Sequence, residues 1–136
     1  MRIGFPHYPS IPAFDVPDRN LVGVFAPEKQ APPAPAEDLV REAFADPIGV
    51  PPIHRLAAGK KSALILTDDY TRKTPVREIL AVLIPELERA GISPTDTRIM
   101  VALGTHRPMT ESEMEYKFGR DILDSIEVVN HDWQDE

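Results

Sequence analysis

The sequence predicts an α/β fold: a mostly parallel sheet built from βαβ units, with helices packed on it and a proline-rich β-hairpin near the N-terminus. Short apolar runs suited to buried strands occur at 62–67, 99–103 and 126–130. Segments with the apolar spacing of helices lie between them, at 75–90 and 110–118. The resulting repeat of roughly 25 to 35 residues is the length that parallel βαβ units need.

Length and composition restrict the class of protein. A chain of 136 residues, 42% of them hydrophobic, forms about one domain. It contains no cysteine, so disulfides, thiolate metal sites and a cysteine nucleophile are excluded. The net charge of -7 argues against nucleic-acid or anionic membrane partners. No secretion signal or membrane-spanning run is evident, and we expect a cytoplasmic protein.

Proline divides the chain into two parts. Eleven of the fifteen prolines lie in the first 52 residues, where only short edge strands and turns are expected. There, 11–16 and 21–25 flank the turn-forming residues 17–20, which predicts the hairpin, and 37–45 has the apolar stripe of a helix. We therefore expect residues 1–52 to form the hairpin and first helix, and 53–136 to form the βαβ core.

The core begins with a short helical piece at 53–58 and the strand at 62–67. Thr74 is a good N-cap and Pro75 suits the first helical position, so a helix is expected to start there and run to about Ala90. Pro85 lies in its interior and is expected to kink or interrupt it.

The next unit centres on the stretch from Ile99 to Thr110. Five apolar residues followed by Gly104 predict a strand that is buried on both faces. Thr110 and Glu113 form a capping box, which predicts a helix start. No glycine-rich dinucleotide motif or phosphate-binding loop is present.

Three polar segments follow the three predicted strands. They are DDYTR at 68–72, GTHRP at 104–108 and NHD at 130–132. Loops at the carboxyl ends of parallel strands converge on one edge of the sheet, where ligands usually bind. We therefore expect a common crevice, whose candidate residues are Asp68, Asp69, Thr71, Arg72, His106, Arg107, His131 and Asp132. Two arginines in an acidic chain point to a carboxylate or phosphate ligand.

The residue types alone leave several functions open. His106 is either an acid/base group or a structural histidine, and the aspartates are either ligands or solvated turn formers. One alternative is a metal-dependent hydrolase with Asp68, Asp69, His106 and His131 as ligands. Another is an anion-binding module without chemistry that depends on Arg72.

Three motifs together carry a resemblance to a known family. The segment D-Y-T-R-K-T-P at 69–75, then G-T-H-R-P at 104–108 and N-H-D at 130–132, resembles the N-terminal part of the nickel-pincer-nucleotide lactate racemase family. The residues VPDRN at 16–20, followed by LVGVFAP, resemble the start of that family. The resemblance covers nearly the whole chain.

This resemblance implies an isomerase, a racemase or epimerase of 2-hydroxy acids. In the family, hydride passes from the substrate α-carbon to a nickel pincer nucleotide and returns to either face. His106 is then one acid/base histidine and Arg72 the substrate-binding arginine. Asp69, Thr71, Gly104 and Arg107 are the implied cofactor-binding residues, and no metal ligand is expected among the residues of this chain.

The resemblance also implies that part of the enzyme lies outside this sequence. The family's Ser-Gly-Gly-x-Lys segment, its second catalytic histidine and its nickel-binding histidine have no counterpart here. We therefore expect a partial N-terminal domain of a longer enzyme. Alone it should be inactive and hold no nickel, its partners being a lactate-like 2-hydroxy acid and the C-terminal part of the same protein.

Overall fold

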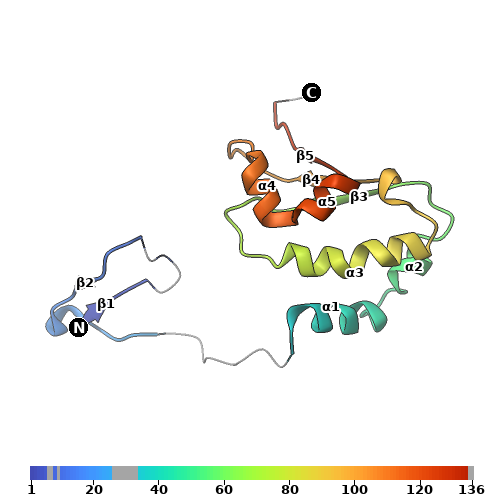
Figure 1. Cartoon of the computed structure of the whole chain (residues 1–136). Coiled ribbons are helices and arrows are strands. Elements are labelled where there is room, and N and C mark those ends of the chain that lie inside the picture. The colour runs from blue at the N-terminus through green and yellow to red at the C-terminus, as the bar shows by residue number, and fades with distance from the viewer. Residues whose placement is uncertain (6–7, 9, 26–33, 135–136) are drawn as a thin grey trace. The chain divides into compact units, whose positions relative to one another are not determined.

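The computed structural model describes residues 1–5, 8, 10–25 and 34–134 (Figure 1). By its contacts the chain divides into two units, Met1–Ala31 and Pro32–Glu136, and each is described by itself.

The first unit contains an antiparallel strand pair, as predicted, but with a different partner. Strand β1 (Arg2–Ile3) pairs with β2 (Phe14–Asp15), so that Ile3 lies opposite Phe14. A 3-10 turn, η1 (Asp18–Asn20), follows β2. The prediction that 21–25 returns as the second strand is wrong, because the Val16 N–H is already bonded to the Met1 carbonyl and the Leu21 N–H closes the turn on Asp18.

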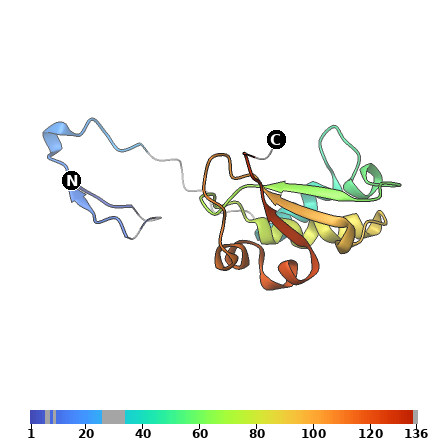
Figure 2. The same ribbon diagram turned by 90° about the horizontal axis from the view of Figure 1, so that it is seen from above.

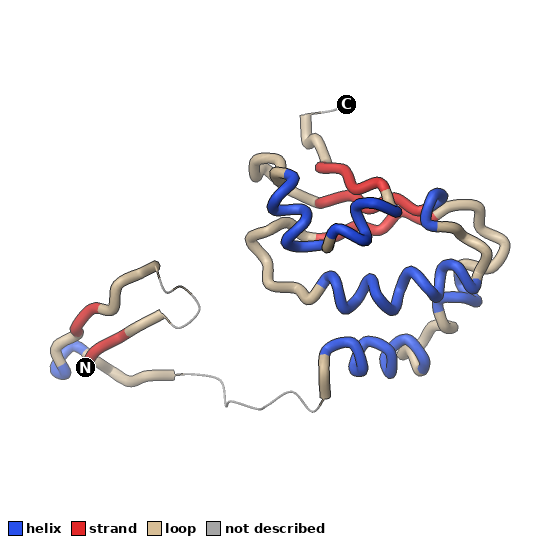
Figure 3. The backbone as a smooth tube through the Cα atoms, in the orientation of Figure 1, coloured by secondary structure: helices blue, strands red, loops and turns tan. Residues whose placement is uncertain are grey.

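The second unit is a three-stranded parallel sheet with helices. Its strands are β3 (Ala63–Thr67), β4 (Thr97–Val101) and β5 (Glu127–Asn130), in the order β3-β4-β5. The crossover from β3 to β4 contains α3 (Val76–Arg89) and the turn η2 (Pro94–Asp96). The crossover from β4 to β5 contains α4 (Glu111–Phe118) and α5 (Arg120–Ser125). The predicted fold class is therefore confirmed (Figure 3).

Two more helices precede the sheet. Helix α1 (Ala36–Ala45) and the short α2 (Ile53–Leu56) both pack against α3. Helix α1 lies on the side of α3 that faces away from the sheet (Figure 1). No helix in the described part of the chain is long and apolar enough to cross a membrane.

The core lies between the sheet and the helices of the two crossovers. Its completely buried side chains are Phe118, Leu80, Ile92, Ile99 and Val101. Helix α3 contributes Val76 and Leu80. The helix continues across Pro85, so the expected interruption does not occur, while the alternative of a kink stays a prediction. Packing of apolar residues on both sides of Pro85, at Val82 and Leu87, holds the helix together there.

The other face of the sheet is open within the described residues. Figure 2 shows the sheet from above, on the side away from α1 and α3. Leu64 and Leu66 in β3 are 55% and 66% exposed, whereas Ile99 in β4 is completely buried. In the 99–103 segment, half-buried Met100 and exposed Ala102 alternate with the buried residues. The prediction that this strand is buried on both faces is therefore wrong. Strands added in one direction by right-handed crossovers bring all crossover helices to the same face, and covering both faces requires a reversal of strand order.

Candidate active site

The carboxyl ends of the three strands lie in one row. Thr67 at the end of β3 is in register with Val101 of β4, which is in register with Asn130 of β5. The three polar segments of the sequence therefore leave the sheet at the same edge, as predicted. Gly104 makes the turn after β4 with a positive φ of 58°, a conformation that favours glycine.

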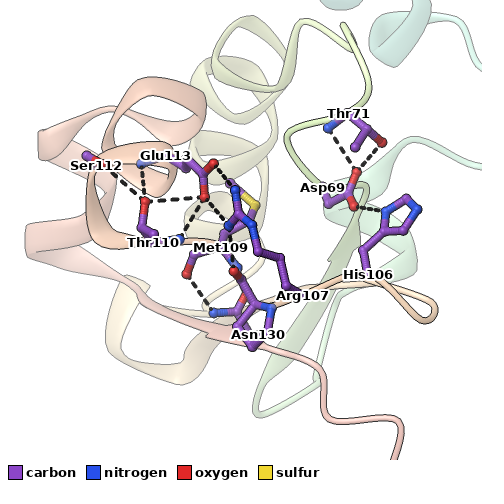
Figure 4. A network of polar contacts seen from close by, with 10 residues as sticks. Asp69, Thr71, His106, Arg107, Met109, Thr110, Ser112, Glu113 and Asn130 are labelled. Carbon is purple, nitrogen blue, oxygen red and sulfur yellow. Dashed lines mark hydrogen bonds and ion pairs between the residues drawn. The ribbon is translucent and has the colours of Figure 1, made fainter.

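Asp69 and His106 form the central pair of this edge (Figure 4). Nδ1 of His106 lies 2.5 Å from Oδ2 of Asp69. The other carboxylate oxygen accepts from the Thr71 N–H at 3.0 Å and from the Thr71 hydroxyl at 2.6 Å. The Asp69 side chain is only 4% exposed, whereas that of His106 is 50% exposed. A buried, fully bonded carboxylate thus supports a histidine that is open to solvent.

The electrostatics of Asp69 keep it ionised. Burial acts to raise its pKa, but hydrogen bonds from Thr71 and His106 outweigh this and lower the pKa to about 2. An ionised carboxylate accepts a proton-bearing Nδ1, which leaves Nε2 of the neutral ring as an acceptor. The ring can therefore take a proton on the side directed away from Asp69.

Arg72 and His106 line the same hollow, whose volume is about 330 Å³. Asp69, Thr71 and Gly104 also line it. The Arg72 backbone N–H bonds to the Asp69 carbonyl at 3.2 Å. Among the described residues, no side chain pairs with the exposed Arg72 guanidinium. The residues around the hollow therefore include an acceptor nitrogen, Nε2 of His106, and the permanent positive charge of Arg72. These groups suit a small anion that carries a hydroxyl group.

Within the described residues Arg107, unlike Arg72, is paired with a carboxylate. Its Nη2 and Nη1 donate to the two carboxylate oxygens of Glu113 at 2.7 and 2.9 Å, and its guanidinium lies 4.7 Å from the centre of the Tyr70 ring. The hydrogen bonds that Arg107 donates to Glu113 raise the pKa of Arg107 and lower the pKa of Glu113 to about 2. Glu113 also completes the predicted capping box with Thr110. Arg107 thus links the His106 loop to the start of α4.

Asp68 also lines the hollow, but its carboxylate bonds to Lys117 of helix α4 and to Thr74, and not to His106. Its Oδ1 accepts from Nζ of Lys117 at 2.6 Å, and its Oδ2 accepts from the Thr74 hydroxyl. Burial acts to raise the pKa of Asp68, but the bonds from Lys117 and Thr74 lower it. The expectation that Thr74 caps α3 is wrong, because its hydroxyl is used by Asp68 and the helix starts at Val76 without a side-chain cap.

The third polar segment, residues 130–132, lies outside the hollow and supports the site indirectly. Asn130 donates to the Met109 carbonyl at 3.1 Å and accepts from the Met109 N–H at 3.0 Å, which ties the β4–α4 loop to the end of β5 (Figure 4). The His131 N–H extends the sheet by bonding to the Val101 carbonyl. The Asp132 carboxylate accepts from the Gln134 N–H in its own turn. Neither His131 nor Asp132 lines the hollow.

Sequence reasoning missed Lys117 and the supporting role of Asn130. For Lys117 a signal was available, because it lies three residues after the apolar Met114, on the same side of the predicted helix. A lysine on an apolar stripe indicates a buried partner. For Asn130 the strand-end position was recognised, but nothing local identified Met109 as its partner.

No metal centre is formed by the described residues. They contain no group of three or more His, Cys, Asp or Glu side chains arranged to hold an ion. Asp68 is occupied by Lys117 and Thr74, and Asp69 by Thr71 and His106. This arrangement gives no support to the metal-dependent hydrolase.

A parallel α/β sheet that carries a carboxylate-supported histidine and an available arginine at its carboxyl edge defines an enzyme-like site for a small anion. Comparison with protein families identifies which family the chain belongs to. Residues 10–136 match the lactate racemase N-terminal domain, and the chain belongs to this family, as its sequence motifs indicated.

Relatives in two organisms support the same assignment. The chain is 36% identical over 133 residues to the lactate racemase of Thermoanaerobacterium thermosaccharolyticum. The matched region covers 96% of this chain and 31% of that protein. It is also 36% identical over 95 residues to the lactate racemase of Lactiplantibacillus plantarum, covering 70% of this chain and 22% of that protein. The chain therefore spans less than a third of the length of these relatives.

Solved structures share the fold. The lactate racemase apoprotein of T. thermosaccharolyticum superposes with a TM-score of 0.70 at 35% identity, over 88% of this chain and 27% of that one. A Thermotoga maritima protein superposes with a TM-score of 0.52 at 26% identity, over 73% of this chain and 22% of that one.

Proposed function

We propose that this chain is the substrate-facing N-terminal part of a lactate racemase-like enzyme that acts on 2-hydroxy acids. In this proposal His106 exchanges the proton of the substrate hydroxyl, and Arg72 holds the substrate carboxylate. The observation that supports the proposal is the shared hollow, which is lined by both His106 and Arg72.

The histidine is suited to acid/base work. Asp69 orients the ring through Nδ1, so Nε2 is the atom that takes a proton from a hydroxyl and returns it. Proton transfer by a positioned group is worth about a hundred- to ten-thousand-fold in rate. Both enantiomers of a 2-hydroxy acid carry the hydroxyl and the carboxylate that these two residues would contact. The second acid/base histidine that the family resemblance implies lies outside this sequence, so His106 is proposed as one of two such groups.

The hollow also fits the cofactor that the family implies. Arg72 and Thr105 line it at the carboxyl edge of a parallel sheet, and their guanidinium and hydroxyl groups are donor types that suit the phosphate and carboxylate groups of a pyridine nucleotide. We propose that Asp69, Thr71 and Gly104 face the cofactor. We propose that Arg107 contributes indirectly, by holding the loop that carries Gly104 and His106 against the start of α4. When bound, a nickel pincer nucleotide supplies the acceptor for the substrate hydride.

Activity is proposed for the whole enzyme, because the racemases to which the chain is similar are more than three times longer than their matching regions. We infer that a further C-terminal part supplies the remaining catalytic groups and the attachment of the nickel cofactor. The chain by itself is then inactive.

The test is racemisation of D- and L-lactate by the full-length protein supplied with the cofactor, followed by chiral chromatography. His106→Gln should lower kcat in both directions by about a hundred- to ten-thousand-fold. Arg72→Met should mainly raise KM, because it removes the cation for the substrate carboxylate. Arg55→Met is the matched control, since Arg55 is exposed and does not line the hollow.

Two results would contradict the proposal. One is an unchanged kcat in folded His106→Gln. The other is anion binding that depends on Arg72 while no 2-hydroxy acid is racemised by the complete, cofactor-loaded protein. The latter would favour an anion-binding module instead.

A further inference from the structure

Lys117 is a buried cation next to the site. Its side chain is 6% exposed, and it comes from helix α4, 48 residues away in sequence from Asp69. Its ammonium donates to Oδ1 of Asp68 at 2.6 Å and to the main-chain carbonyl of Asp69 at 2.8 Å. Burying an ammonium group costs free energy unless it is paired and hydrogen-bonded, and here both conditions are met.

The two bonds of Lys117 fix a short piece of backbone. The Asp69 carbonyl accepts from Lys117 on α4 and also from the Arg72 N–H within its own loop. Asp68, directly before it, is held from two sides, by Lys117 and by the Thr74 hydroxyl just before α3. The peptide that carries Asp69 is therefore attached to the ends of two helices.

The Asp69 side chain emerges from this fixed backbone toward His106. Its carboxylate has one oxygen on Thr71 and the other on Nδ1 of His106. Charges on two elements surround the pair: Asp68 and Arg72 come from the β3–α3 loop, and Lys117 comes from α4. Lys117 is the only one of these cations that bonds directly to the Asp68–Asp69 segment through its side chain among the described residues.

We propose that Lys117 is a positioning residue of the site: by holding the Asp68 carboxylate and the Asp69 carbonyl, it aims the Asp69 carboxylate at Nδ1 of His106 and so selects the ring tautomer whose Nε2 is free. This inference rests on the proposed function for its catalytic consequence. The positioning itself is independent of which substrate the enzyme uses.

The direct test is ¹⁵N NMR of the ring nitrogens in protein labelled with ¹⁵N-histidine, at a pH where the ring is neutral. The four histidines are assigned with His106→Gln and matching variants of the others. In the wild type the His106 ring should be in the Nδ1–H form. Lys117→Met should give a mixture of both tautomers, Lys117→Arg should largely restore the wild-type form, and Lys60→Met, an exposed lysine before β3, should change nothing.

Kinetics of the full-length enzyme provide a second readout. Lys117→Met should lower kcat about 10- to 100-fold and leave KM within about threefold, because a misplaced acid/base group slows the reaction step more than it weakens binding. Lys117→Arg should recover most of that loss.

A wild-type tautomer and a wild-type kcat in folded Lys117→Met would overturn the proposal. Should Lys117→Met fail to fold, the measurements are made on Lys117→Gln, which keeps a neutral donor in place. Failure of both variants to fold would also overturn it, since Lys117 would then serve the fold and not the site. The tautomer change needs no substrate, so observing it in a protein without racemase activity would reject the proposed function while supporting the positioning role.

Discussion

Nδ1 of His106 lies 2.5 Å from Oδ2 of Asp69, although 37 residues separate the two in the chain. The register of β3 on β4 brings them together, since each follows the end of its strand at the same edge of the sheet. The aspartate is buried and the histidine is open. The pair therefore leaves Nε2, the ring nitrogen away from Asp69, without a bond to this carboxylate.

Asp69→Asn should lower kcat of the full-length enzyme by at least about 100-fold with a smaller effect on KM. The amide can turn its N–H₂ group toward Nδ1, which favours the tautomer with its proton on Nε2, the wrong one for a base. Steady-state racemisation in both directions measures this. Asp124→Asn, at an exposed position on α5, is the control. Equal kcat values in the wild type and Asp69→Asn would show that the charge has no such role.

The same carboxylate should make stability depend on acid pH. Because the pKa of Asp69 falls from its ordinary value of 3.8 to about 2 on folding, the native state binds fewer protons than the unfolded state in this range. Its contribution, about 2 kcal/mol, is present above pH 4 and is lost as the pH falls toward 2. The lowered pKa of Asp68 acts in the same direction.

Urea unfolding at several pH values between 5 and 2 measures this dependence. The free energy of unfolding of Asp69→Asn should fall less steeply over that range than that of the wild type. Identical slopes would mean that Asp69 titrates alike in the folded and unfolded states. Asp124→Asn again serves as the control, and it should follow the wild type.

Some local signals in the sequence predicted this structure correctly, and others did not. The Thr110–Glu113 capping box depends on residues three apart, and it starts α4 as predicted. The strand ends were also predicted to meet at one edge, because parallel crossovers leave few alternatives. Choices between distant partners were not predictable. The partner of β2 is Arg2–Ile3 and not 21–25. A local signal also failed, because the Thr74 hydroxyl bonds to Asp68, six residues earlier, instead of capping α3.

The two arginines of the site illustrate the same limit. Arg72 and Arg107 follow adjacent strands and are equivalent by composition and position. Only the folded structure distinguishes them, since Glu113 and Tyr70 engage Arg107 while no described side chain pairs with Arg72. Recognition of a family motif added what spacing could not, namely which of the two is the candidate for binding substrate.

Asn130 should hold the His106 loop to the end of β5. Asn130→Ala removes both of its bonds to Met109 and leaves two main-chain groups without their partner, so unfolding free energy should fall by about 1–3 kcal/mol. Hydrogen exchange of the Met109 amide should become faster in this variant. Asn130→Asp is the matched comparison, because it keeps the acceptor for the Met109 N–H and loses only the donor. An unchanged exchange rate in Asn130→Ala would contradict this role.

The one-sided burial of the sheet predicts a large loss of unfolding free energy for truncation of Ile99 and a small loss for truncation of Leu66. Ile99→Ala removes a completely buried side chain between the sheet and the helices, and it should cost about 2–5 kcal/mol of unfolding free energy. Leu66→Ala, on the open face of β3, should cost this chain less than about 1 kcal/mol, because that side chain is 66% exposed. Denaturant unfolding of the 136-residue chain measures both. Comparable losses would mean that the face bearing Leu66 is covered, for example by a second copy of the chain. Repeating the measurement at several protein concentrations identifies that case, because only association makes the loss of unfolding free energy depend on protein concentration.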